Sequence, residues 1–410
     1  MLTLLHPEVV PLLHDLSMGL LPLWFKNDDR PKLVIKAPKE ALLAAKLNHG
    51  FKIYAAPVTA QNKRTMGLVT AFFDVEDEPL VTFTPMFAEP WVQDLKCVLL
   101  SSALDIHFFD DNNRELLGYE ANIQCSSGTR DFIEHTALLS FDIASARSSL
   151  DQMAQWFGLR TVNDDCAAIS VILGASLFPE DIFIQDLRPE NHSYQGSQPF
   201  SFSQLVRQEP GPFQERDIVQ LLHRVFSPEQ IYLGPLRVTD REEIADVLVV
   251  TKSRALFIQA KDSPNTEEVL RNPIRRKKAT AKKSLTKAVD QVRGALRYAK
   301  SMVPMKMLVG GKEAELMLEG LELRALIVVK ELFNDEYSIY SPAVLSLAEQ
   351  TQVPCIALDY TELHMYTANL SDEDLFFEAY DVVFTNDNIT GAFPRLRFGL
   401  SGSDWSGGAD

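Results

Sequence analysis

Two neighbouring runs of the chain, residues 244–250 and 255–261, are apolar except for Asp246, Gln259 and Lys261. Both runs are rich in strand-forming residues and have the length of a strand. A short polar segment, residues 251–254, separates them. The pattern therefore predicts an antiparallel hairpin closed by this segment, with Val250 opposite Ala255.

This register brings three polar side chains to one face of the hairpin. With Val250 opposite Ala255, Asp246 lies opposite Gln259. Successive side chains of a strand point to opposite faces, so Lys261 shares the face of Gln259. Polar residues at alternate positions are also typical of an edge hairpin with a solvated face, and that interpretation stays open at this point. The other face carries residues that should pack on a core: Val247, Val249, Leu256 and Ile258.

Helical and extended patterns alternate around the hairpin, between residues 213 and 370. Apolar residues recur at helical spacing in residues 213–226, before the hairpin, and in residues 280–301, after it. The elements expected next are a strand at 323–330, a helix at 341–350, a strand at 354–359 and a helix at 361–370. Parallel strands joined by helices form a sheet covered on both faces, so we predict an α/β domain with a mixed sheet flanked by helices.

The first 190 residues predict a separate mixed α/β or α+β module. Its expected strands are 32–36, 51–58, 66–73, 80–84, 104–109 and 116–123, and its expected helices are 38–47, 129–140 and 145–157. A turn signal at residues 110–114 predicts that the last two strands form a hairpin. Residues 191–212 are dense in Pro, Gly, Ser and Asn and predict a linker. Residues 371–410 predict an extension with an acidic patch, a strand pair and a loose tail.

Charge is distributed unevenly along the chain. The net charge is −16, which by itself disfavours general affinity for nucleic acid. Residues 271–300 nevertheless contain eleven basic residues and a single acid, Asp290. A cationic segment in an acidic protein favours binding to a phosphate backbone, although a solvated helix surface would carry similar charges.

An aspartate facing a glutamine and a lysine suits phosphodiester hydrolysis. A carboxylate holds a hard divalent ion, the ion lowers the pKa of its bound water, and a lysine orients the attacking water or neutralises developing charge. On Asp246 and Gln259-Ala260-Lys261, the sequence resembles the PD-(D/E)xK nuclease superfamily, in particular its Mrr-like and NERD-like restriction-endonuclease branch. Gln259 departs from the commoner Glu or Asp, and this Q-x-K variant is familiar in that branch.

The resemblance covers residues 213–370 and implies a restriction-endonuclease-like αβββαβ core. It further implies a Mg²⁺ or Mn²⁺ ion held by Asp246, the backbone carbonyl of Ala260 and Glu215, with Gln259 positioning water or metal and Lys261 assisting the attacking water. DNA is the implied substrate, with RNA left open, and defence against foreign DNA is the implied setting. For Glu215, a first-turn glutamate favoured by the helix dipole is an equal alternative.

The residues expected to contact nucleic acid lie in and after the basic stretch: Arg275, Arg276, Lys277, Lys278, Lys282, Lys283, Lys287 and Gln291. Gln291 enters this set only because glutamines of the corresponding helix in NERD-like nucleases face the active site. Glu242 and Glu243, just before the first strand of the hairpin, are expected to be solvated.

No other feature of the sequence predicts a second catalytic or binding site. Asp74, Glu76, Asp77 and Glu78 favour a solvated loop over a cation site, because no partner residues are spaced for ligation. Gly310-Gly311-Lys312 lacks the remainder of a phosphate-binding loop and predicts an ordinary turn. The four cysteines are scattered and the N-terminus has neither a signal peptide nor a membrane span, so we expect a cytoplasmic protein.

Two other functional hypotheses remain beside the enzyme. One is a catalytically inactive nuclease-like domain that binds nucleic acid or a protein. The other places the function in the acidic N-terminal module, which would recruit a protein partner, sense a trigger or restrain the nuclease. A homo-oligomer without membrane contact is expected in each case.

Overall fold

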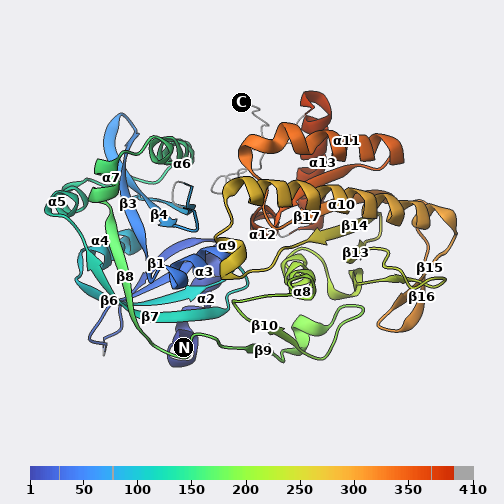
Figure 1. The fold of residues 1–410 in the computed structure, drawn as a ribbon, viewed down its shortest axis with the longest axis horizontal. Helices are drawn as coiled ribbons and strands as arrows, with labels where there is room; N and C mark the ends of the chain where they lie inside the picture. The colour runs from blue at the N-terminus through green and yellow to red at the C-terminus, as the bar shows by residue number, and fades with distance from the viewer. Residues whose placement is uncertain (27, 76–77, 371, 392–410) are drawn as a thin grey trace.

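Two large sheets organise the protein (Figure 1). The computed structural model describes residues 1–26, 28–75, 78–370 and 372–391. An eight-stranded sheet lies in the N-terminal half, and a five-stranded sheet lies in the C-terminal half. Helices pack on both sheets, so the predicted mixed α/β class is confirmed.

The N-terminal sheet has the strand order β1-β2-β6-β7-β8-β3-β4-β5 and pairs antiparallel except for β2 with β6. Its strands are β1 (Gly19–Leu23), β2 (Lys32–Lys36), β3 (Gly50–Ala60), β4 (Lys63–Phe72), β5 (Leu80–Pro85), β6 (Ala103–Phe109), β7 (Glu115–Gln124) and β8 (Ile169–Ser176). The helices of this half are α1 (Leu2–Leu5), α2 (Val10–Asp15), α3 (Lys39–Leu47), α4 (Pro90–Leu100), α5 (Ser127–His135), α6 (Ile143–Gly158) and α7 (Val162–Ala167).

All six strands expected in this half are present, including the β6–β7 hairpin. The sequence pattern missed β1, β8 and α4, and α5 ends at His135 rather than at residue 140. Pro22 interrupts the strand pattern of β1, and the structure tolerates it because β1 is the first strand at the edge of the sheet.

The C-terminal sheet has the strand order β11-β13-β14-β17-β18. Its strands are β11 (Ile231–Leu233), β13 (Val247–Val250), β14 (Arg254–Lys261), β17 (Glu322–Val329) and β18 (Cys355–Asp359). The pairs β11–β13 and β13–β14 are antiparallel, whereas β14–β17 and β17–β18 are parallel. The mixed sheet expected for this domain is therefore present, with the carboxyl ends of three parallel strands at one edge.

Helices line this sheet, with α10 along one side and α8 along the other in Figure 1. The helices are α8 (Gly211–Leu222), α9 (Glu267–Leu270), α10 (Ile274–Ser301), α11 (Tyr337–Thr351), α12 (Tyr360–Asn369) and α13 (Glu373–Thr390). A smaller sheet of β12 (Leu236–Arg237), β15 (Met305–Val309) and β16 (Lys312–Leu316) completes this half, and Gly310 and Gly311 form the turn between β15 and β16 at positive φ.

Three boundaries differ from the sequence-based prediction. Helix α10 begins at Ile274, several residues before the expected start at 280, so most of the basic stretch is helical. Residues 373–390 form α13 rather than a strand pair, and Phe376, Phe377 and Tyr380 bury their rings in the C-terminal core at helical spacing. The tail from residue 392 lies outside the described residues.

The segment predicted as a linker is packed. It contributes β10 (Ser201–Ser203), which pairs with β9 (Ile184–Asp186). Leu205 belongs to the N-terminal hydrophobic core, and the Arg207 side chain is 1% exposed and bonded to Asp217 of α8. Pro and Gly here set the path of an ordered connection instead of loosening it.

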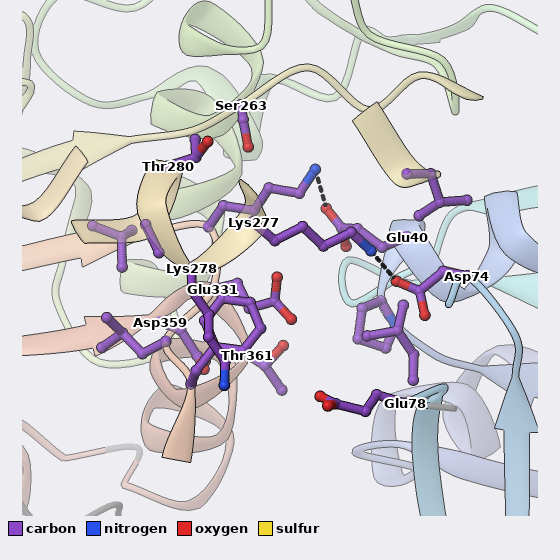
Figure 2. Close-up of a pocket in the computed structure, with 18 of the residues that line it drawn as sticks. Glu40, Asp74, Glu78, Ser263, Lys277, Lys278, Thr280, Glu331, Asp359 and Thr361 are labelled. Carbon is purple, nitrogen blue, oxygen red and sulfur yellow. Dashed lines mark hydrogen bonds and ion pairs between the residues drawn. The ribbon is translucent and has the colours of Figure 1, made fainter. Parts of the chain in front are cut away.

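Charged residues from both halves meet where the two sheets adjoin. Lys39 lies 3.4 Å from Asp262, Lys330 lies 3.4 Å from Glu40, and Lys277 pairs with Asp74. Figure 2 shows the Lys277–Asp74 pair reaching across from one half to the other. The N-terminal half therefore covers the edge of the C-terminal sheet at which β14, β17 and β18 end.

Candidate hydrolytic site

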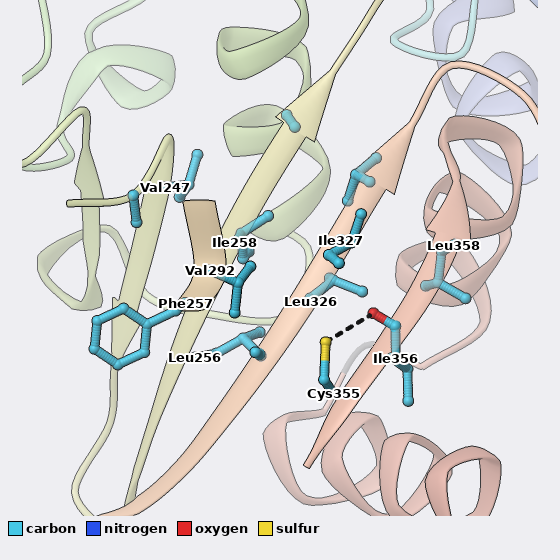
Figure 3. Packing of buried hydrophobic residues seen from close by; sticks show 14 of the residues in the cluster. Val247, Leu256, Phe257, Ile258, Val292, Leu326, Ile327, Cys355, Ile356 and Leu358 are labelled. Carbon is cyan, nitrogen blue, oxygen red and sulfur yellow. Dashed lines mark hydrogen bonds between the residues drawn. The ribbon is translucent and has the colours of Figure 1, made fainter. Parts of the chain in front are cut away.

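The hairpin has the predicted register. Val250 pairs with Ala255 and Val247 with Ile258, so Asp246 lies just beyond the last antiparallel pair. Leu256 and Ile258 pack against Val292 of α10, as Figure 3 shows, and this is the hydrophobic face predicted from the sequence. The polar residues consequently point to the opposite face, towards α8.

Asp246 is held by the next strand. Its side chain is 3% exposed, and its Oδ2 accepts a hydrogen bond of 2.5 Å from the backbone N–H of Ala260. The same oxygen lies 3.4 Å from Nζ of Lys261. Adjacent strands thus bring the acid and the ammonium group to one patch. Asp246 and Gln259 are buried and both strands are internal in the sheet, so the alternative of an edge hairpin with a solvated face is wrong.

The ammonium group of Lys261 has two hydrogen-bond acceptors. Its side chain is 19% exposed, and its ammonium group also donates a 2.7 Å hydrogen bond to the carbonyl of Ala260, one of the predicted metal ligands. The lysine therefore lies beside Asp246 and Ala260 together. In this arrangement the Ala260 carbonyl oxygen already has a hydrogen-bond donor.

Gln259 presents an unsatisfied oxygen inside the protein. The residue is 1% exposed, and its Nε2 donates to the carbonyl of Ile244 at 3.4 Å. Its Oε1 is buried without a hydrogen-bond partner. A buried amide oxygen in this state is costly unless a donor or a cation reaches it.

Glu215 lies close enough to Asp246 and Lys261 for their charges to shift the pKa of its carboxyl. Burial, followed by the charge of Asp246, raises the pKa of the Glu215 carboxyl to about 7, and Lys261 acts in the opposite direction. Helix α8 begins at Gly211 and has no acid in its first turn. The alternative of a first-turn glutamate stabilised by the helix dipole is therefore wrong.

Glu243 is exposed, as is Glu242, so the prediction that both are solvated is confirmed. The Glu243 carboxyl nevertheless belongs to the same cluster, because its partial burial and the charge of Asp246 raise its pKa to about 8. The backbone bond from Ile244 N–H to the Pro235 carbonyl holds the segment in place. Its position three residues before Asp246 is the only signal in the sequence, and that signal does not separate it from Glu242.

The donor set fits a divalent cation. Glu215, Glu243 and Asp246 supply three carboxyls against the single ammonium group of Lys261, and Gln259 adds a neutral oxygen, a combination that suits Mg²⁺ or Mn²⁺. Among the described residues, three donors within 4.8 Å of one another occur instead in α5, at Asp131, Glu134 and His135, all exposed. Closing the site around an ion therefore requires side-chain rotation of Glu215 or Glu243.

The expected nucleic-acid contacts fall into three groups. Lys277 and Lys278 near the start of α10 are ion-paired with Asp74 and Asp335, respectively. Gln291 is half-buried, and its Oε1 has no hydrogen-bond partner. The remaining cations are exposed: Arg275, Arg276, Lys282, Lys283 and Lys287.

The acids after β4 are only partly solvated. Asp74 has a side chain that is 6% exposed and bound to Lys277, so the prediction of a solvated loop is wrong for this residue. Glu78 is exposed, and Glu76 and Asp77 lie outside the described residues. The sequence held no sign that a distant helix would supply the counter-ion of Asp74.

A pocket of about 520 Å³ adjoins the site. Lys261 and Asp359, which end two of the parallel strands, line it together with the beginning of α10. Glu40, Asp74 and Glu78 form its wall on the N-terminal half, as Figure 2 shows.

Comparisons with known proteins return no relative: no family model, no curated protein and no solved structure matches this chain. Within the part of the chain that the structure describes, no helix combines the length and the hydrophobicity needed to cross a membrane.

Proposed function

We propose that this protein is a divalent-metal-dependent endonuclease that hydrolyses phosphodiester bonds, with DNA as the substrate. The observation that carries the proposal is the 3.4 Å approach of the Lys261 ammonium group to Asp246, beside a buried and unpartnered oxygen of Gln259. The order α8, β11, β13, β14, α10, β17 also fits the αβββαβ core of the PD-(D/E)xK superfamily. A role in defence follows only from that resemblance and stays a prediction.

Each residue has a distinct part in this proposal. Asp246, Glu215 and Gln259 hold Mg²⁺ or Mn²⁺, with Glu243 as an additional acid and the Ala260 carbonyl as a further oxygen. The bound ion supplies an activated water and polarises the scissile phosphate. Lys261 orients the attacking water and offsets the negative charge that develops on the phosphate.

The exposed cations of α10 supply the electrostatic attraction for a polyanion. Arg275, Arg276, Lys282, Lys283 and Lys287 lie on one helix and remain open to solvent. Binding through them weakens steeply as salt is added, because each phosphate contact releases a counter-ion.

A second candidate is a nuclease-like module that binds nucleic acid without cleaving it. Two observations favour it: Gln259 replaces the commoner carboxylate, and the Lys261 ammonium group already donates to the Ala260 carbonyl. In that case the five exposed cations of α10 still bind nucleic acid, but no hydrolysis follows.

Cleavage of a supercoiled plasmid and of single-stranded circular DNA tests the proposal. With Mg²⁺ or Mn²⁺ the wild type should cut at least one of them, and Asp246→Ala and Lys261→Ala should each lose about a hundredfold or more in rate while still binding DNA. Lys306→Ala removes an exposed lysine of β15 and should cut like the wild type. Binding without cleavage by the wild type supports the second candidate, and unchanged cleavage by Asp246→Ala would contradict the assigned site.

A further inference from the structure

The pocket between the two halves lies where ligands of α/β proteins commonly bind. Lys261, Lys330 and Asp359 line it at or directly after the carboxyl ends of β14, β17 and β18. Ligands bind outside the carboxyl ends of parallel strands in open α/β sheets. Its volume of about 520 Å³ falls in the range of small-molecule sites and accommodates one or two nucleotides.

One end of the pocket is suited to phosphate. The first three turns of α10 line it through Lys277, Lys278 and Ser284, so the cavity lies along one side of this helix. Lys277 and Lys278 supply two ammonium groups, each held by a single carboxylate, Asp74 and Asp335 respectively. A phosphate that enters between these pairs would replace Asp74 and Asp335 as the partners of the two lysines.

The opposite wall is suited to hydrogen-bond donors. The side chain of Asp74 is more than nine-tenths buried, and while its Oδ2 binds Lys277, its Oδ1 is buried without a partner. Oγ1 of Thr82 is also buried without a partner. Across the pocket, burial raises the pKa of the Glu331 carboxyl to about 7 against the influence of Lys277. Figure 2 shows Asp74 and Glu331 on facing walls.

Apolar surface completes the lining. Leu80 and Val81 of β5 are half-buried on the side of the N-terminal half. Phe333 is half-buried on the other side, with the Lys278 ammonium group 5.7 Å from the centre of its ring. A half-buried aromatic ring next to cations is the combination on which bases stack in single-strand-binding proteins.

We propose that this pocket binds a nucleotide, with the phosphate at the start of α10, the sugar or base donors at Asp74 and Thr82, and the base between Phe333 and β5. Anionic oxygens, hydrogen-bond donors and a flat apolar ring occur together in this class of compound. The nucleotide is either free in solution or an unpaired unit of a nucleic-acid strand, and both sources share this chemistry.

The site is separate from the catalytic groups, although Lys261 lies at the border of both. The inference does not require hydrolysis, because the lining contains neither Asp246, Glu215 nor Gln259. Binding measured with EDTA therefore tests the pocket independently of the proposed nuclease activity.

Isothermal titration of the full chain with AMP, GMP, CMP and UMP, and with a tetradeoxyadenylate, tests the inference. At least one of these probes should bind with a Kd below about 1 mM. Ser284→Trp fills the pocket and should weaken that binding about tenfold or more. Thr286→Trp, at an exposed position two residues further along the same helix, is the matched control and should bind like the wild type.

The titration distinguishes a free nucleotide from an unpaired unit of a nucleic-acid strand. Tighter binding of the tetranucleotide than of any mononucleotide identifies a strand as the ligand, and equal or tighter binding of a mononucleotide identifies a free nucleotide. Lys277→Ala should also weaken binding, which keeps the test decisive if Ser284→Trp does not fold. The inference is overturned if no probe binds in this range, or if binding is the same in wild type, Ser284→Trp and Lys277→Ala.

Discussion

At the scale of single residues, the carboxyl groups at Asp246 and around it outnumber the positively charged groups that could neutralise them. Lys261 is the ammonium group beside it, while Glu215 and Glu243 have pKa values raised to about 7 and about 8 by burial and by Asp246. Like charges at this spacing favour retention of protons. A divalent cation, which we propose for this site, would reverse that preference.

The raised pKa of Glu215 predicts a pH-dependent effect on stability. The folded state holds this proton more tightly than the unfolded chain, so the carboxyl lowers stability as pH rises from about 4.5 to about 7. Glu215→Gln should therefore raise the free energy of unfolding at pH 8 by about 1–3 kcal/mol, with a smaller gain at pH 5. Urea unfolding at both pH values measures this.

The control for this prediction is Glu313→Gln, at an exposed position of β16, which should change stability little at either pH. Equal or lower stability of Glu215→Gln at pH 8 would show that Glu215 is not strained by its neighbours.

At the scale of elements, a buried charge triad fixes the helix that carries Glu215. Asp217 of α8 accepts from Arg114 of the β6–β7 turn at 2.8 Å and from Arg207 at 2.7 Å. These guanidinium groups hold the pKa of the Asp217 carboxyl well below its usual range. The N-terminal half thus contributes directly to the placement of α8.

Asp217→Asn should destabilise the protein by about 3–5 kcal/mol at pH 7, because the buried Arg207 loses its carboxylate partner and the buried Arg114 keeps only Asp110. The contribution of Asp217 is present above the ordinary pKa of an aspartate and is lost as pH falls, so the difference from wild type should shrink in acid. Asp381→Asn breaks a more exposed pair with Arg324 and should cost about 1 kcal/mol or less. Denaturant unfolding of the two variants compares them, and similar losses in both would contradict the account of the triad.

The sequence pattern correctly predicted those strands and helices that have one apolar face and one face with polar residues. The hairpin register follows from the four-residue polar segment between two strand-forming runs, and the two-residue period of a strand then predicts Asp246, Gln259 and Lys261 on one face. The start of α10 was missed because Arg275 and its basic neighbours show no apolar spacing, although they are helical. Glu243 is exposed as predicted, but its proximity to Glu215 and Asp246 was not predicted, because only the folded chain brings these acids together.

At the scale of the whole molecule, the two halves behave as one structure. Leu205 and Leu270, which follow the N-terminal half in sequence, belong to its hydrophobic core. Arg224 donates to the Asp111 carbonyl at 3.0 Å, and His364 hydrogen-bonds with the Ser17 carbonyl at the same distance. No sequence pattern indicated these pairings, because each joins segments that are locally independent.

This interface predicts a single cooperative unfolding transition for the full chain. Separation of the halves would leave buried charges such as Lys39 and Asp262 without partners, which is unfavourable before either half unfolds. Scanning calorimetry and circular dichroism should give one coincident transition, at moderate and at high salt, because buried pairs are screened weakly. Two well-separated transitions would instead show two independent domains.

The position of a bound divalent ion tests the central claim most directly. In crystals of the protein soaked with MnCl₂, anomalous scattering should place Mn²⁺ about 2.0–2.6 Å from a carboxylate oxygen of Asp246, with a second oxygen from Glu215 or Gln259. Asp246→Asn should lose this ion. Mn²⁺ bound only at Asp131, Glu134 and His135, or no ion beside Asp246, would contradict the account.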